Sequence, residues 1–177
     1  SQFLEAEKDD SHFAELQFRL GQVLLELGRE AESRDHFQRA LDEDSLRFRA
    51  DTVINRRIRE AAQAWRDQGV RLLDVEQLFA QHSSNRISGE SLFYEHVHLT
   101  PEGNYILARA AAEEAAACLR LTNGSPAAAR QKVWLSQKEC EAGIGLTEWN
   151  RSRTVRMIVD RMGLPPFPGT VNHTNRL

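Results

Sequence analysis

The stretch SLFYEHVHLTPEGNYILA, residues 91–108, contains an acidic residue close to two histidines, and a clear helix start follows directly after them. Thr100 is a favoured N-cap residue, and Pro101 follows at the first helical position, where proline is tolerated best. The apolar and alanine-rich residues after it predict a helix that continues to Leu119. We therefore expect the residues before Thr100 to form a loop that leads into this helix.

An acidic residue and a histidine, Glu95 and His98, lie three positions apart in that loop. The positive end of the helix dipole lies near His98 and favours the neutral imidazole that a general base needs. A carboxylate three residues earlier can accept a hydrogen bond from the other ring nitrogen and so fix the tautomer. Glu95 and His98 are therefore the candidate catalytic residues. A surface hydrogen bond between them, without catalysis, is the alternative interpretation.

The segment EHVHLTPEG resembles the last conserved block of the SGNH (GDSL-type) hydrolases, in which Asp-x-x-His is followed by a glycine five residues after the histidine. In this resemblance Glu95 takes the position of the acid, His98 is the catalytic histidine and Gly103 is the helix-opening glycine. The chain departs from the family in having glutamate, one methylene longer than aspartate. The resemblance covers roughly residues 46–119 and implies hydrolysis or transfer of an ester, either of a small molecule or of a glycan.

The resemblance also implies a nucleophilic serine in a Gly-Asp-Ser block and an oxyanion hole, which the family has in earlier blocks. Neither block occurs in the 177 residues, so the serine is expected to lie outside this chain. The loop does contain serines, but none is in a Gly-x-Ser-x-Gly or Gly-Asp-Ser motif, and turn positions suit them better. These are Ser83, Ser84, Ser88 and Ser91.

The sequence predicts a mainly α-helical chain in three parts. Residues 1–45 are expected to form a helical hairpin, and residues 122–177 a helical extension with an extended tail. Residues 46–121 would be the C-terminal part of an SGNH-like domain, and the resemblance implies a helix, one short strand and a helix there. The residues themselves predict the helix over 50–65 and the strand over 70–75.

The N-terminal hairpin resembles a tetratricopeptide repeat. Gly21 lies in its first helix, and Phe37 and Ala40 follow sixteen and nineteen residues later. Small residues at such positions let two antiparallel helices approach closely. Gln17 departs from the pattern, because the repeat prefers an aromatic residue there. A helical module that binds a protein partner through this hairpin, without catalysis, is the alternative function.

Helical periodicity predicts further helices over residues 12–27, 30–41, 127–142 and 146–162. Thr147 is the expected cap of the last of these. Residues 1–11 are charged and are expected to be frayed. The tryptophans have helical spacing among apolar neighbours and are expected to belong to the core: Trp65, Trp134 and Trp149.

The composition is that of an ordinary globular protein, with 41% hydrophobic residues, 28% charged residues and a net charge of -3. It has no basic excess to suggest nucleic-acid binding and no apolar run of 18 residues to span a membrane. His96 and His98 form a His-x-His pair that, with Glu95, offers three potential metal ligands, but no further ligand motif accompanies them. We therefore predict no metal or cofactor, and His96 is expected to pack or hydrogen-bond beside the site.

The predicted strand and the helices beside it would lack covering elements within this chain. Parallel strands are normally buried on both faces, and unpaired strand edges invite partners. Either self-association or a packing in which the C-terminal residues cover these surfaces is therefore expected.

Overall fold

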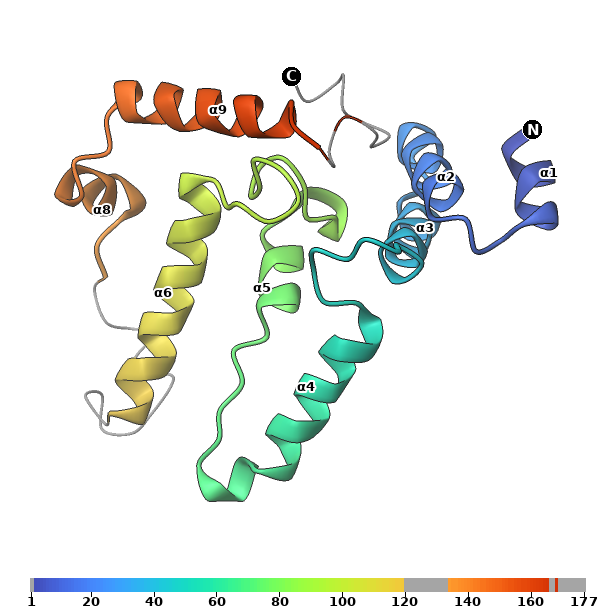
Figure 1. Cartoon of the computed structure of the whole chain (residues 1–177). Coiled ribbons are helices and arrows are strands. Elements are labelled where there is room, and N and C mark those ends of the chain that lie inside the picture. The colour runs from blue at the N-terminus through green and yellow to red at the C-terminus, as the bar shows by residue number, and fades with distance from the viewer. Residues whose placement is uncertain (1, 120–133, 166–167, 169–177) are drawn as a thin grey trace. The chain divides into compact units, whose positions relative to one another are not determined.

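A computed structural model describes residues 2–119, 134–165 and 168 (Figure 1). These residues form eight α-helices and short 3₁₀ turns, and no β-strand. The mainly α fold class is therefore confirmed for the described residues. The chain divides into two compact units, one of Ser1–Leu72 with Ser84–Ile87 and the other of Leu73–Ser83 with Ser88–Leu177.

The first unit contains four α-helices and two 3₁₀ turns. They are α1 (Gln2–Asp9), α2 (Ala14–Glu26), α3 (Glu30–Asp42), α4 (Thr52–Ala64), η1 (Arg66–Gln68) and η2 (Ser84–Arg86). The helices expected over residues 12–27, 30–41 and 50–65 are thereby confirmed. The frayed segment expected at residues 1–11 is wrong, because its first eight described residues form α1.

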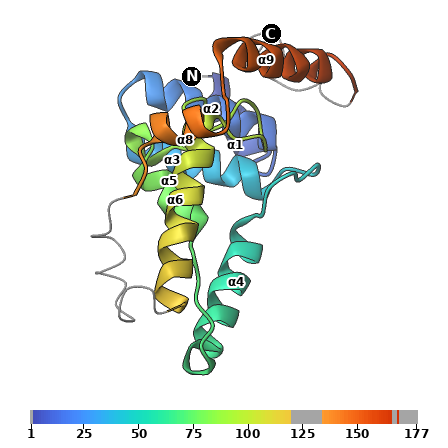
Figure 2. The same ribbon diagram turned by 90° about the vertical axis from the view of Figure 1, so that its left-hand side faces the viewer.

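Helices α2 and α3 pack side by side, as Figures 1 and 2 show. A Cβ atom at Gly21 would lie 2.9 Å from the ring of Phe37, so this contact needs glycine. The Ser33 hydroxyl, buried in the same contact, donates a hydrogen bond of 2.7 Å to the carbonyl of Gly21. The close approach at Gly21 agrees with the sequence, while the likeness to a tetratricopeptide repeat stays a prediction.

The strand predicted over residues 70–75 is wrong. Residues 70–74 belong to no helix or strand, and Val75 already begins the helix α5 (Val75–Gln81). Asp74 caps this helix, since its Oδ1 accepts a hydrogen bond of 3.1 Å from the amide of Gln77. A strand needs a neighbour to satisfy its peptide groups, and the described residues provide none, whereas an Asp N-cap needs only the local chain.

The second unit contains α5 and three further described helices, α6 (Pro101–Cys118), α8 (Gln137–Gly143) and α9 (Glu148–Met162). Thr100 caps α6, and Thr147 caps α9, as predicted. The helix predicted over residues 127–142 is found in its last part as α8, but it is wrong over residues 134–136, which are not helical and end in Ser136, the cap of α8. Residues 127–133 lie outside the described residues. Most of the extended tail expected after residue 163 lies outside them as well.

The prediction that the tryptophans belong to the core is wrong for two of them. Trp65, at the end of α4, and Trp149, in α9, are exposed, and Trp134 is half-buried. Helical spacing identifies the face on which a side chain lies but not whether another element covers that face. None of the helices in the described part of the chain is sufficiently long and apolar to cross a membrane.

Candidate functional site

The loop between α5 and α6, which carries Glu95 and His98, folds back on itself (Figure 1). The amide of Tyr94 donates a hydrogen bond of 2.8 Å to the carbonyl of His98, and the amide of Thr100 donates one of 2.9 Å to the carbonyl of Leu92. The candidate residues therefore lie in a closed turn whose two ends are joined by backbone hydrogen bonds.

Packing holds this turn against the helices of its own unit. The Leu92 side chain is fully buried, and the Phe93 ring meets Phe79 of α5 edge to face, with centroids 5.5 Å apart. A Cβ atom at Gly103 would lie only 2.4 Å from the carbonyl oxygen of Leu92. Glycine at position 103 therefore lets the loop backbone lie directly against the first turn of α6.

The Thr100 hydroxyl joins the helix cap to the loop. It accepts a hydrogen bond of 3.2 Å from the amide of Gly103 and donates one of 2.9 Å to the carbonyl of Ser91. Capping α6 and closing the loop thus depend on the same oxygen atom.

The carboxylate of Glu95 is the centre of the turn, and its side chain is only 4% exposed. Its Oε1 accepts hydrogen bonds from the His98 amide, at 2.7 Å, and from the Nδ1 of His98. Its Oε2 accepts one of 3.0 Å from the amide of Val97 and lies 2.9 Å from the Nδ1 of His96. Three hydrogen-bond donors and the nearby Nδ1 of His96 therefore surround one buried carboxylate.

These donors keep Glu95 ionised. Burial raises the pKa of the Glu95 carboxyl, but the backbone and side-chain hydrogen bonds from His98, the Val97 amide and nearby His96 together lower that pKa below its ordinary value. An ionised carboxylate only accepts hydrogen bonds, so the Nδ1 of His98 must carry its proton. The Nε2 of the neutral ring is then the basic nitrogen.

The imidazole of His98 is accessible, with 70% of its side chain exposed. Among the described residues, only Glu95 lies within hydrogen-bonding distance of that ring. The structure therefore brings the two predicted site residues together and leaves the outer nitrogen of His98 open to a reactant.

No serine of the described residues hydrogen-bonds to the His98 ring. The Ser83 hydroxyl instead donates to the carbonyl of Phe79, at 2.7 Å, as a helix-end residue does. In the same described part of the chain, no group of three or more His, Cys, Asp and Glu residues is arranged to hold a metal ion. The Nδ1 atoms of His96 and His98 lie against different oxygens of the Glu95 carboxylate, Oε2 and Oε1.

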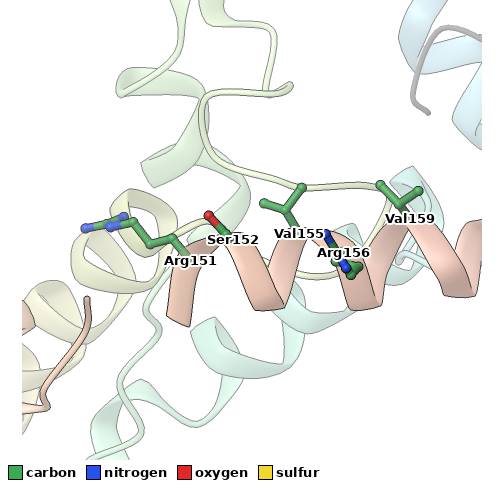
Figure 3. A pocket seen from close by; sticks show the side chains of 5 residues that line it. All are labelled: Arg151, Ser152, Val155, Arg156 and Val159. Atoms are coloured by element: carbon green, nitrogen blue, oxygen red, sulfur yellow. The ribbon is translucent and has the colours of Figure 1, made fainter. Parts of the chain in front are cut away.

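A shallow depression on α9 is a separate feature of the second unit. Figure 3 shows its lining side chains, all of which come from this one helix: Arg151, Ser152, Val155, Arg156 and Val159. Arg151 is already ion-paired with Glu141 of α8. The depression includes neither residue of the Glu95–His98 pair and offers no acid–base chemistry of its own.

Sequence reasoning missed the residues that hold the pair in place. Val97 and the buried Leu92 belong to no sequence motif, and His96 was expected only to pack or hydrogen-bond beside the site. The signal that pointed to His96 was its position next to Glu95 in the His-x-His pair.

The likeness to the SGNH block remains a prediction that rests on residues 95–103, because the strand expected ahead of them is not found in the described residues. The chain matches no protein-family model, and it is similar to no curated protein and to no solved structure.

Proposed function

We propose that this chain supplies the acid–histidine pair of an SGNH-like ester hydrolase or acyltransferase, and that the nucleophilic serine comes from outside the 177 residues. One observation carries the proposal. The buried Glu95 carboxylate binds the Nδ1 of His98 while the rest of that ring is exposed. This is the arrangement in which a carboxylate sets the tautomer of a general base.

The reaction assigns a distinct step to each group. The serine oxygen attacks the carbonyl carbon of the ester, and its proton passes to the Nε2 of His98. The resulting imidazolium is stabilised by the charge of Glu95 and then gives that proton to the leaving alcohol. Water, or a second alcohol in a transferase, attacks the acyl-serine in the same way and regenerates the free serine.

The longer glutamate is accommodated by the fold of the turn. The amides of Val97 and His98 bind one oxygen each, so the carboxylate bends back towards its own backbone. The extra methylene relative to aspartate is absorbed within the loop, and Oε1 still reaches the Nδ1 of His98. These contacts support the proposal that glutamate performs here the task that the family gives to aspartate.

Hydrolysis of an activated aryl ester by the complete gene product tests the proposal. Removing one member of a triad lowers kcat by orders of magnitude, so we expect His98→Ala to reduce turnover by at least about 1,000-fold. His82→Ala is the matched control, because among the described residues the imidazole of His82 hydrogen-bonds only to the carbonyl of Leu78 in α5.

The 177-residue chain alone should hydrolyse the ester no faster than its His98→Ala variant, because it lacks a positioned serine and oxyanion hole. His98-dependent turnover by this chain alone would show that its nucleophile lies within the 177 residues. Activity of the complete product that survives His98→Ala would overturn the proposal.

A further inference from the structure

Two imidazoles share the carboxylate of Glu95, one on each oxygen. The Nδ1 of His98 binds Oε1, and the Nδ1 of His96 lies 2.9 Å from Oε2. The proposed reaction uses only the first of these contacts. The second contact is the better shielded, since the side chain of His96 is 19% exposed and that of His98 is 70% exposed.

We infer that His96 is a positioning residue, which fixes the carboxylate of Glu95 through Oε2 so that Oε1 faces the Nδ1 of His98. The catalytic meaning of this inference rests on the proposed function. The placement itself follows from the contacts of the turn and does not depend on where the serine lies.

Glutamate needs such a constraint more than aspartate does. Its side chain has three rotatable bonds, and its terminal torsion has a broad, roughly two-fold profile. The Val97 amide alone would hold Oε2 from one side. The imidazole of His96, whose Nδ1 lies 2.9 Å from Oε2, restricts rotation of the carboxylate about its last bond, and with it the direction in which Oε1 accepts from His98.

His96 does not serve as the base in this arrangement. Its Nδ1 is directed at Glu95, and most of its side chain is withdrawn from solvent. The two histidines therefore differ in role although they flank the same acid. His98 presents its outer nitrogen to a reactant, and His96 holds the acid that orients it.

The test is the tautomer of His98 in the 177-residue chain, measured by NMR of ring-labelled histidine above the pH at which the rings lose their charge. We expect mainly the Nδ1-protonated form in the unchanged chain. Loss of the Nδ1–Oε2 contact in His96→Ala should reduce the ratio of the Nδ1–H to the Nε2–H form by about two- to ten-fold, the factor expected for one polar contact. His96→Asn, whose amide nitrogen can take the place of Nδ1, should restore the ratio to within about two-fold.

His12→Ala is the matched control. His12 forms an exposed pair with Glu43, Nδ1 to Oε1 at 2.8 Å, in the first unit, so its loss should leave the His98 ratio unchanged. Should His96→Ala fail to fold, His96→Leu keeps apolar volume at the position without a donor. An unchanged ratio in a folded variant without the donor, or an Asn variant that behaves like Ala, would overturn the inference. Absence of His98-dependent hydrolysis in the complete gene product would instead count against the proposed function alone.

Discussion

Replacing Glu95 by glutamine perturbs the centre of the site with almost no change in shape. The two oxygens of the carboxylate accept hydrogen bonds from two backbone amides and from the Nδ1 of His98, and Oε2 also lies 2.9 Å from the Nδ1 of His96. Glutamine offers one accepting oxygen and one NH₂ group that only donates. The two imidazoles can change tautomer to accept from that NH₂ group, but the amides of Val97 and His98 cannot.

At least one of these two amides therefore loses its acceptor in Glu95→Gln. A hydrogen bond to a charged group contributes about 1.5–3 kcal/mol. If the loss is confined to the turn, exchange of the Val97 and His98 amides with solvent should accelerate by about 10- to 150-fold, the factor that corresponds to this free energy. If the turn unfolds only together with its unit, the same loss of free energy lowers the urea concentration at the midpoint of unfolding.

The assay is amide exchange by NMR, combined with urea unfolding, and Glu43→Gln is the matched control. Glu43 pairs with the exposed His12 and accepts from no backbone amide of the described residues, so its replacement should cost no more than about 1 kcal/mol. A Glu95→Gln variant whose amide exchange and urea midpoint both match those of Glu43→Gln would refute this account of the turn.

Three further predictions concern the same loop and the helix α4. The pKa of Glu95 is lowered in the folded chain, so its contribution to stability is present above the unfolded value of about 4.3 and is lost as the pH falls towards the folded value. Below about pH 4.3 the urea midpoint of Glu95→Gln should therefore depend less on pH than that of the unchanged chain, and equal pH slopes would contradict this. Gly103→Ala should destabilise the chain by about 1–3 kcal/mol in urea unfolding, because the new Cβ would meet the Leu92 carbonyl. Gly89→Ala is the control, because no atom lies within 4 Å of its Cβ, and an equal effect of the two substitutions would be evidence against this packing. None of the residues of α4 is buried, and Ile58 is exposed on its apolar face, so this face is expected to self-associate. Light scattering should show a mass that rises with protein concentration, and the rise should be smaller in Ile58→Glu. The mass of a monomer at every concentration would contradict self-association.

The helix starts could be predicted from the sequence because capping is local chemistry. Thr100 and Thr147 lie within three residues of the amides that they cap, so the sequence contains the whole interaction. The Glu95–His98 contact belongs to the same class, since both partners lie in one short turn. Gly21 was informative for a related reason, because a glycine in an apolar helix face indicates close approach.

The features that could not be predicted depend on residues far apart in the chain. The apolar run over residues 70–75 has the composition of a strand, but a strand forms only when a neighbour pairs with it, and Asp74 provides a helix cap at once. Trp65 and Trp149 have core-like spacing, but burial depends on a covering element that the sequence pattern does not identify. The support of the turn by Leu92 and Gly103 likewise appears only when the loop and α6 are placed together.

The central claim is that His98, oriented by Glu95, activates a serine outside these 177 residues. The most direct measurement is covalent labelling of the complete gene product with a fluorophosphonate, which reacts with activated serines, followed by mass spectrometry to locate the label. The account predicts one labelled serine that precedes Ser1 or follows Leu177, with the rate of labelling reduced by orders of magnitude in His98→Ala and unchanged in His82→Ala. Labelling that proceeds equally fast without His98, or a label on a serine within the 177 residues, would contradict it.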